Sequence, residues 1–259
     1  MANDVIVCIP VWNGSRLEQT LATIPENIPR EVLNNKELDW PLAKCWNYFL
    51  KKYKDDYKTI IISNDDVEFP QGSILAMGYT LYSLQYDRPG LEALIVTGYD
   101  PNVEGRKDLD MIWMPDRLGF ACGMYCFCTS KKLVEVAGYF DEKFTPAMYE
   151  DTDMVYRVKL AGFEVYSCIP VYHHDGGGNT HKTDKERKQL MKDTRPGLEQ
   201  YYIEKWGGLP WRETYTTPFD PESAGDPRYV REFESDNGIK ADDVMFNIQT
   251  VPEEIMVDD

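Results

Sequence analysis

Short apolar runs alternate with segments of helical spacing along the first hundred residues. Continuous apolar runs bounded by turn residues predict buried strands at residues 5–11, 59–62 and 93–97. Apolar residues three and four positions apart predict helices at residues 17–24, 42–54 and 72–85. Ser15 is a candidate N-cap for the first helix, and Pro25 and Pro29 break the chain after it. This alternation predicts an α/β fold with a mostly parallel central sheet flanked by helices.

The second half of the chain carries two further strand patterns and two helix patterns. Strands are predicted at residues 120–129 and 163–169. One helix is predicted at residues 131–137 and ends at Gly138, and another opens near residue 149 and ends at Gly162. Beyond about residue 215 the sequence is turn-rich and acidic. We therefore predict one domain over residues 1–215, with halves at about 1–100 and 101–215, and an acidic C-terminal tail over 216–259.

The charge balance narrows the classes of function. The chain has 259 residues with 44 Asp and Glu against 28 Lys and Arg, a formal net charge of −16. Such a surface repels phosphates, so general nucleic-acid binding is not expected. No apolar run approaches the roughly 20 residues of a membrane-spanning helix. The start of the chain lacks the basic and apolar pattern of a secretory signal, which predicts a cytoplasmic location.

Six cysteines are consistent with that compartment. Most lie inside apolar runs, where buried, reduced thiols are expected. Cys122, Cys126 and Cys128 are close in sequence, which raises the alternative of a metal site. No second cysteine pair stands at zinc-finger spacing, so a structural zinc site is not predicted.

Polar residues follow two of the predicted strands, at residues 12–15 and 63–66. Ligands of open α/β sheets bind beyond the carboxyl ends of the strands, so both positions point to a site. Asn64, Asp65 and Asp66 offer hard oxygen ligands for Mg²⁺ or Mn²⁺. The alternative is a polar turn, because Asn and Asp commonly form turns.

A run of carboxylates opens the helix near residue 149. Asp153 is readily explained as a residue of the first turn, where the helix dipole favours acids. The helix dipole explains three acids in one turn, Glu150, Asp151 and Asp153, less well. Like charges this close disfavour ionisation and raise one another's pKa. A carboxylate that acts as a base near neutral pH is the functional interpretation.

Two of the three histidines, His173 and His174, are adjacent and precede three glycines. Glycines allow backbone to approach a ligand closely, so this position favours a ligand or catalytic role over a structural one. Neighbouring strand residues point to opposite faces, so one of the two is expected to enter the site.

Two further segments have both a structural and a functional interpretation. Residues 181–195 are net basic, and they form either a solvated helix of mixed charge or a segment that closes over a diphosphate. The aromatic residues after position 200 either pack a helix on the core or stack on sugar rings. These are Tyr201, Tyr202, Trp206, Trp211 and Phe219.

Several of these motifs occur in the same order as in a known protein family. The chain resembles the family-two glycosyltransferases of the GT-A fold, in particular the rhamnosyltransferase-like branch. The resemblance covers about residues 4–182 and rests on motifs at 9–13, 64–67, 138–144, 150–153, 161–163 and 173–180, with Leu17, Leu21, Ala43, Asn47 and Arg157.

That resemblance implies an inverting transfer of a sugar from a nucleotide-diphosphate donor to an acceptor hydroxyl of a glycan or glycoconjugate. It assigns Asp151 as general base beside Glu150. It assigns Asp66 as the best ligand of a Mn²⁺ or Mg²⁺ ion and Asp65 as the second, completed by His173 or alternatively His174. The resemblance also implies that residues 1–100 form the nucleotide-sugar half of the domain and that residues 101–215 form the acceptor half.

The resemblance also implies contacts to both substrates. Donor-binding residues are expected to be Pro10, Val11, Trp12, Asn13, Asn47, Asn64, Asp65 and Lys182. Acceptor-binding residues are expected to be Trp113, Gly123 and Tyr149. The chain departs from the family at Asn64, where an Asp is usual, and at residues 32–35, where the family has an acid that holds the nucleoside. UDP and dTDP sugars are both compatible donors.

Two other classes of protein remain as alternatives. One is a degenerate relative that binds glycans or nucleotides without transfer, which Asn64 favours and Glu150–Asp151 disfavour. The other is a nucleotidyltransferase, which the lack of a Gly-rich loop after the first strand disfavours. Residues 220–259 hold 12 Asp and Glu against 3 Lys and Arg, so the tail is expected to solubilise the protein or to mediate homo-oligomer formation.

Overall fold

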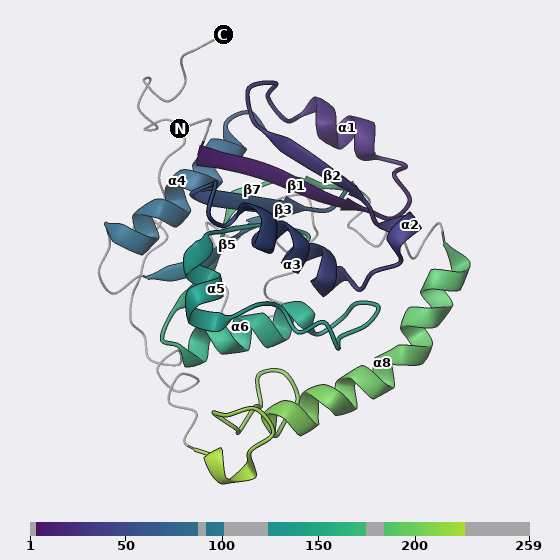
Figure 1. The fold of residues 1–259 in the computed structure, drawn as a ribbon, viewed down its shortest axis with the longest axis vertical. Helices are drawn as coiled ribbons and strands as arrows, with labels where there is room; N and C mark the ends of the chain where they lie inside the picture. The colour runs from purple at the N-terminus through teal and green to yellow at the C-terminus, as the bar shows by residue number, and fades with distance from the viewer. Residues whose placement is uncertain (1–3, 88–91, 101–123, 175–183, 226–259) are drawn as a thin grey trace.

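The computed structural model describes residues 4–87, 92–100, 124–174 and 184–225. A six-stranded sheet in the order β2-β1-β3-β6-β5-β7 forms its centre (Figure 1). The strands are β1 (Val5–Val11), β2 (Arg30–Asn34), β3 (Thr59–Ser63), β5 (Ala93–Tyr99), β6 (Cys126–Thr129) and β7 (Glu164–Pro170). A small antiparallel sheet pairs β4 (Val67–Glu68) with β8 (Tyr172–His173).

The central sheet is mixed, with one strand reversed. β1 pairs in parallel with β2 and β3, and β5 pairs in parallel with β7. β6 runs antiparallel to both of its neighbours, β3 and β5. The predicted α/β fold with a mostly parallel sheet is therefore confirmed. The parallel alignment of β1 and β3 brings the loops after them to one edge of the sheet.

The described residues contain seven helices. They are α1 (Leu17–Ala22), α2 (Asn35–Leu38), α3 (Leu42–Tyr53), α4 (Ser73–Tyr86), α5 (Lys131–Ala137), α6 (Glu150–Leu160) and α8 (Lys185–Trp206). A 3₁₀ turn, η3 (Pro221–Ser223), follows. α8 is the longest and arches along one side of the molecule (Figure 1).

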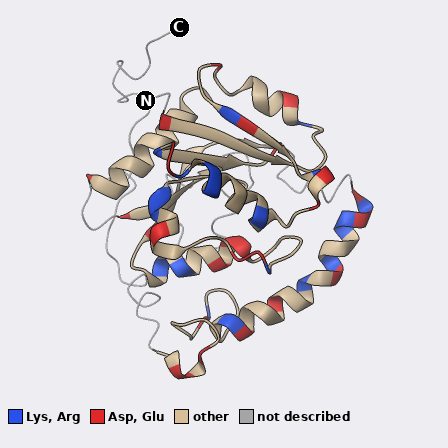
Figure 2. Ribbon diagram, viewed as in Figure 1, with Lys and Arg blue, Asp and Glu red and all other residues tan. Residues whose placement is uncertain are grey.

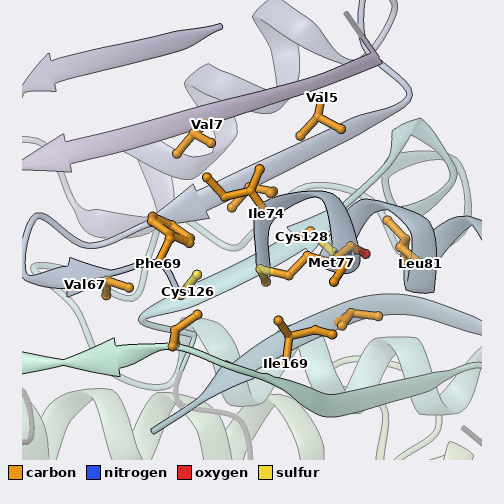
Figure 3. Packing of buried hydrophobic residues seen from close by; sticks show 14 of the residues in the cluster. Val5, Val7, Val67, Phe69, Ile74, Met77, Leu81, Cys126, Cys128 and Ile169 are labelled. Atoms are coloured by element: carbon orange, nitrogen blue, oxygen red, sulfur yellow. Dashed lines mark hydrogen bonds between the residues drawn. The ribbon is translucent and has the colours of Figure 1, made fainter. Parts of the chain in front are cut away.

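One face of the sheet packs mainly against α4. Val5 and Val7 of β1 meet Met77 of α4 and Cys128 of β6 in this cluster (Figure 3). These side chains alternate with residues of the opposite face because successive strand residues point to opposite sides. Full burial of one such side chain stabilises the fold by roughly 1.5–3 kcal/mol.

The other face packs against α3, α5 and α6. Ile6 and Cys8 of β1 contribute to it from the sheet, and Trp46 of α3 contributes from the helices. The Trp46 ring meets the Phe127 and Phe140 rings edge to face at centroid distances of 5.2 and 4.9 Å. The sheet is thus buried on both faces, as its continuous apolar strands predicted.

The helix ends agree with the sequence in two places and differ in a third. Gly138 and Gly162 follow α5 and α6 with φ of +77° and +79°, a backbone conformation that glycine adopts without steric cost. Ser15 is not the N-cap of α1, because Arg16 takes that position without a capping side chain. The Ser15 backbone N–H instead donates to Asn13 Oδ1.

The cysteine prediction is confirmed for the described residues. Cys8, Cys45, Cys126, Cys128 and Cys168 are free and buried, and Cys122 lies outside the described residues. Across the described part of the chain, no helix combines the length and apolarity that crossing a membrane requires.

Candidate functional site

The loops after β1 and β3 meet at the carboxyl edge of the sheet. The Gly14 N–H donates to Asp65 Oδ2 at 3.0 Å, and Thr20 Oγ1 donates to the Asp65 carbonyl at 3.0 Å. Burial raises the pKa of Asp65, the Gly14 hydrogen bond opposes that rise, and the charge of Asp66 adds to it. One carboxylate oxygen of Asp65 therefore holds the loop after β1 in place.

Asp66 and His173 lie side by side at the same edge. Residues 67 and 173 are paired in the small sheet, and the His174 N–H donates to the Asp66 carbonyl at 2.9 Å. This pairing places His173 Nε2 3.1 Å from Asp66 Oδ1, although 107 positions separate the residues in sequence. Their side chains are 11% and 5% exposed.

Two further residues position His173, one at its ring and one at its backbone, and the sequence did not single out either. Tyr125 stacks on it at a centroid distance of 4.2 Å and an interplanar angle of 15°. The backbone N–H of His173 donates to Asp100 Oδ2 at 3.1 Å. A packed ring keeps a fixed direction, which a metal ligand or an ion-pair partner needs.

The Asp66–His173 pair fits part of a metal shell. A carboxylate oxygen beside an imidazole nitrogen suits Mn²⁺ better than Mg²⁺, which takes oxygen ligands. The other two predicted ligands have different partners, since Asp65 holds Gly14 and His174 Nε2 lies 2.8 Å from Glu68 Oε1. Among the described residues, no three His, Cys, Asp or Glu side chains form a metal cluster.

The acidic start of α6 contains two carboxylates with raised pKa values. Burial, followed by the charges of Asp151 and Asp153, raises the pKa of Glu150 to about 8. Burial also raises the pKa of Asp151, and hydrogen bonds from the Thr152 N–H and hydroxyl oppose that rise. Glu150 is buried and Asp151 only partly so. Asp151 is therefore the more accessible base.

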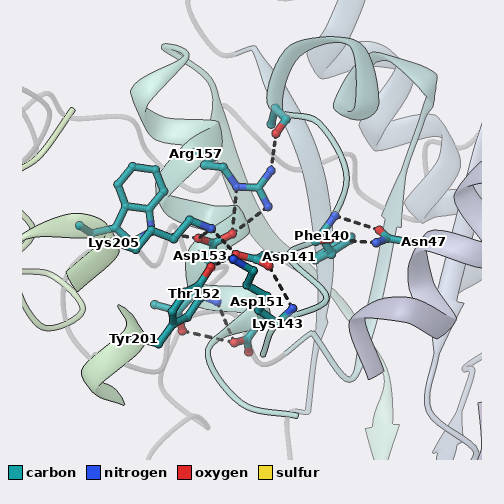
Figure 4. Close-up of polar contacts among 12 residues, drawn as sticks. Asn47, Phe140, Asp141, Lys143, Asp151, Thr152, Asp153, Arg157, Tyr201 and Lys205 are labelled. Atoms are coloured by element: carbon teal, nitrogen blue, oxygen red, sulfur yellow. Dashed lines mark hydrogen bonds and ion pairs between the residues drawn. The ribbon is translucent and has the colours of Figure 1, made fainter. Parts of the chain in front are cut away.

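The third carboxylate, Asp153, has a structural role. Its Oδ2 accepts from Arg157 Nε at 2.9 Å, and its Oδ1 accepts from Trp206 Nε1 at 2.9 Å (Figure 4). Lys205 Nζ lies 2.6 Å from the same Oδ1. The buried Asp153 carboxylate thus ties α6 to the last turn of α8. All three acids lie in the first turn of α6, and the N-cap residue is Tyr149, whose side chain makes no capping bond.

The backbone before α6 adopts a conformation that non-glycine residues rarely take. Met148 and Tyr149 have φ of +92° and +72°. Each such residue costs on the order of 1–3 kcal/mol and persists where surrounding contacts enforce it. The Tyr149 hydroxyl donates to Glu199 Oε2 of α8 at 2.8 Å, and its ring packs on Tyr202. The predicted acceptor residue Tyr149 therefore lies between α6 and α8.

Asn47 has structural partners. Its amide donates to the Phe140 carbonyl at 2.8 Å and accepts from the Phe140 N–H at 2.9 Å (Figure 4). It also donates to Glu142 Oε1 at 2.9 Å. Asn47 was expected to bind the donor, and in the structure it positions the loop ahead of α6.

The first motif lies against the start of α8. Trp12 Nε1 donates to Asp184 Oδ2 at 3.0 Å, and the Arg187 guanidinium lies 3.9 Å from the Trp12 ring centroid. Arg187 also contacts Asp39 at 2.9 Å. The sequence did not predict this cluster, because residues 12 and 184 are 172 positions apart.

The structure describes some of the remaining predicted substrate-binding residues and not others. Pro10 and Val11 are buried in β1, where they pair with Leu33 and Asn34 of β2. The Asn64 N–H donates to the Tyr125 carbonyl at 2.7 Å. Trp113, Gly123 and Lys182 lie outside the described residues.

Comparison with known proteins identified similar structures only. No known family description matches the chain, and no curated protein matches it. The catalytic domain of Drosophila beta1,4galactosyltransferase 7, solved with xylobiose, is 12% identical, with a TM-score of 0.41 over 70% of this chain and 73% of that one. A Pyrobaculum calidifontis mannosyltransferase, solved with GDP-Man and Mn²⁺, is 10% identical, with a TM-score of 0.42 over 75% and 64%.

A third similar structure is a glycosyltransferase involved in the glycosylation of the major capsid of PBCV-1. It is 11% identical, with a TM-score of 0.39 over 73% of this chain and 98% of that one. Similarities at this level assign neither a family nor an activity to this chain. Its α/β architecture is established by the strand order and pairing described above.

Proposed function

We propose that this protein is an inverting, metal-assisted glycosyltransferase of the GT-A fold. It moves a sugar from a UDP or dTDP sugar to a hydroxyl of a glycan or glycoconjugate. The observation that carries the proposal is the Asp66–His173 pair, 3.1 Å apart at the carboxyl edge of the sheet. A binding site for nucleotide diphosphates is expected at that edge.

The environment of Asp151 supports its role as the general base. The carboxylate is partly exposed and accepts hydrogen bonds at Oδ1 from the Thr152 N–H and hydroxyl, at 2.7 and 3.2 Å. These bonds orient the group, and its raised pKa strengthens it as a proton acceptor. Asp151 accepts the proton of the acceptor hydroxyl as the hydroxyl oxygen bonds to the anomeric carbon and the nucleotide diphosphate departs.

Asp66 and His173 are the proposed ligands of Mn²⁺ or Mg²⁺. The ion, when bound, stabilises the negative charge of the departing diphosphate. Trp12 and Asn13, in the loop after β1, are the proposed nucleotide contacts at the same edge of the sheet. We place the activity in the cytoplasm, where the free cysteines stay reduced.

Calorimetry with UDP and dTDP, with and without Mn²⁺, tests the metal pair. We expect Mn²⁺ to tighten nucleotide binding in the wild type and to have little effect in Asp66→Asn and His173→Gln. His174→Gln is the matched control, because the His174 ring faces Glu68. Binding that EDTA leaves unchanged, or a His173→Gln variant that still responds to Mn²⁺, contradicts the proposal. A thermal-shift screen of nucleotide sugars then identifies the donor.

A binding module without transfer activity is the second candidate. It is favoured by the Asp65 carboxylate, which holds Gly14, and by the neutral Asn64 in the same triplet. Both features reduce the negative charge available to a metal. Turnover assays separate the two functions. A module binds the nucleotide sugar without releasing nucleotide diphosphate, and an enzyme releases it when the acceptor is present.

A further inference from the structure

Four cations form a stripe along the first half of α8. Lys185, Lys188, Lys192 and Arg195 stand three, four and three positions apart. Residues at this spacing share one face of an α-helix. The two acids of the segment, Glu186 and Asp193, are seven positions apart and lie on a different face. We call the four cations the basic stripe.

The basic stripe is exposed and largely unpaired. All four of its residues are exposed in the structure. Lys185, Lys188 and Lys192 form no ion pair with any other residue that the structure describes. Their charges are therefore available in a protein whose formal net charge is −16. Figure 2 shows the blue of Lys and Arg concentrated on this half of α8.

The two ends of the stripe lie at the two parts of the candidate site. At the first end, Asp184 receives the hydrogen bond from Trp12, in the loop after β1. At the other end, Glu199, one turn after Arg195, accepts a hydrogen bond from the hydroxyl of Tyr149, the residue just before α6. Lys185 and Arg195 are ten positions apart in the helix, which corresponds to about 15 Å. The stripe thus runs beside the path from the donor loop to Asp151.

We propose that the acceptor is an anionic glycan, a sugar chain that carries carboxylate or phosphate groups, and that the basic stripe binds it. This inference rests on the proposed transferase function. An anionic chain is repelled by most of this acidic surface and attracted by the stripe, so the charge pattern aligns it beside Asp151. A neutral glycan would gain nothing from four exposed cations in this place.

Binding of defined polymers to the full chain tests the proposal. The probes are polygalacturonate for carboxylates and poly(glycerol phosphate) for phosphates, with neutral dextran and a duplex DNA oligonucleotide for comparison. We expect at least one anionic glycan polymer to bind, dextran not to bind, and binding to weaken as salt is added. The double variant Lys188→Gln/Lys192→Gln is expected to bind about three- to tenfold more weakly at low ionic strength.

A matched variant and a donor assay make the test decisive. Lys51→Gln/Lys58→Gln removes the same charge from lysines that are 58% and 69% exposed on other elements, and we expect it to bind like the wild type. Equal loss in both variants, binding of dextran, or DNA binding as tight as that of the glycans overturns the inference. UDP or dTDP binding with Mn²⁺ is measured in parallel. Donor binding without polymer binding overturns this inference alone, and polymer binding without donor binding overturns the proposed function.

Discussion

Neighbouring acids at the start of α6 differ in their burial and in their partners. Asp153 is fully buried and meets two cations and an indole N–H. Glu150 is almost fully buried, and its Oε2 has no hydrogen-bond partner within the part of the chain that the structure describes. Asp151 is partly exposed. The sequence identified the run of acids, whereas the structural role of Asp153 depends on Lys205 and Trp206 of α8 and on Arg157.

The Asp151→Asn variant tests the general base. We expect turnover to fall about 10²- to 10⁴-fold, because an amide cannot accept the proton of the acceptor hydroxyl. Nucleotide binding should persist, since the exchange preserves shape. Steady-state kinetics and calorimetry measure the two quantities, and Asp193→Asn, on the exposed face of α8, is the control. Near-normal turnover of Asp151→Asn would remove this residue from the mechanism.

The raised pKa of Glu150 predicts how stability depends on pH. Its pKa is about 8 in the folded protein against an ordinary value of 4.5, so the folded state binds this proton more tightly. The free energy of unfolding contributed by this group therefore falls as pH rises from about 4.5 to about 8. Glu150→Gln removes that dependence, and at pH 8 we expect it to be more stable than the wild type by on the order of 2 kcal/mol.

Urea unfolding at pH 5, 6.5 and 8 measures this effect. The exposed Glu135 of α5 provides the control, because Glu135→Gln should leave the pH dependence of the wild type unchanged. A Glu150→Gln variant whose stability follows the same pH curve as the wild type would show that this carboxylate is ionised in the fold.

At the scale of elements, periodicity predicted the strands that are buried and the helices that pack on them. β1, α3 and α5 begin and end within a residue or so of the expected positions. β2 was not predicted, because it directly follows Pro29 and forms no continuous apolar run, and its residues are exposed or only partly buried at the edge of the sheet. Only its pairing with β1 makes it a strand, and propensity does not report such pairing.

Lys205 tests how α8 is attached. Its side chain is 8% exposed and lies 2.7 Å from Asp141 Oδ2 and 2.6 Å from Asp153 Oδ1. In Lys205→Met we expect the free energy of unfolding to fall by about 2–4 kcal/mol, because a buried carboxylate loses its cation. Arg157 still pairs with Asp153 and limits the loss.

Chemical denaturation measures this change, with Lys188→Met as the matched control on the exposed part of α8. That variant should shift the free energy of unfolding by no more than about 0.5 kcal/mol. Equal effects of the two substitutions would mean that the ion pairs of Lys205 do not hold the helix.

At the scale of the whole molecule, nearly half of the net charge lies in residues 226–259, the larger part of the acidic tail. Residues 226–259 hold 10 Asp and Glu against 3 Lys and Arg, so their removal changes the formal charge from −16 to −9. Described contacts continue up to Gly225, whose N–H donates to the Thr214 carbonyl at 3.3 Å. A chain that stops after Gly225 keeps these contacts.

Truncation after Gly225 therefore tests the role of the tail. We expect the free energy of unfolding to stay within about 0.5 kcal/mol of the full chain, because no described contact is lost. Solubility should decrease with the lost charge. Light scattering during size-exclusion chromatography reports the assembly state. A smaller assembly after truncation would establish the tail as an oligomer-forming arm, and an unchanged one leaves it the solubilising role.

The sequence by itself determined the α/β class, most element positions and the residue types available for a site. These follow from local rules, because burial imposes a period of two on strands and of 3.6 on helices. The tertiary structure decided which polar residues meet. Asp66 joins His173, Asp65 turns to Gly14, and Trp12 meets Asp184 because strand order and the path of α8 bring distant segments together. Such contacts depend on the packing of whole elements, and no local pattern encodes them.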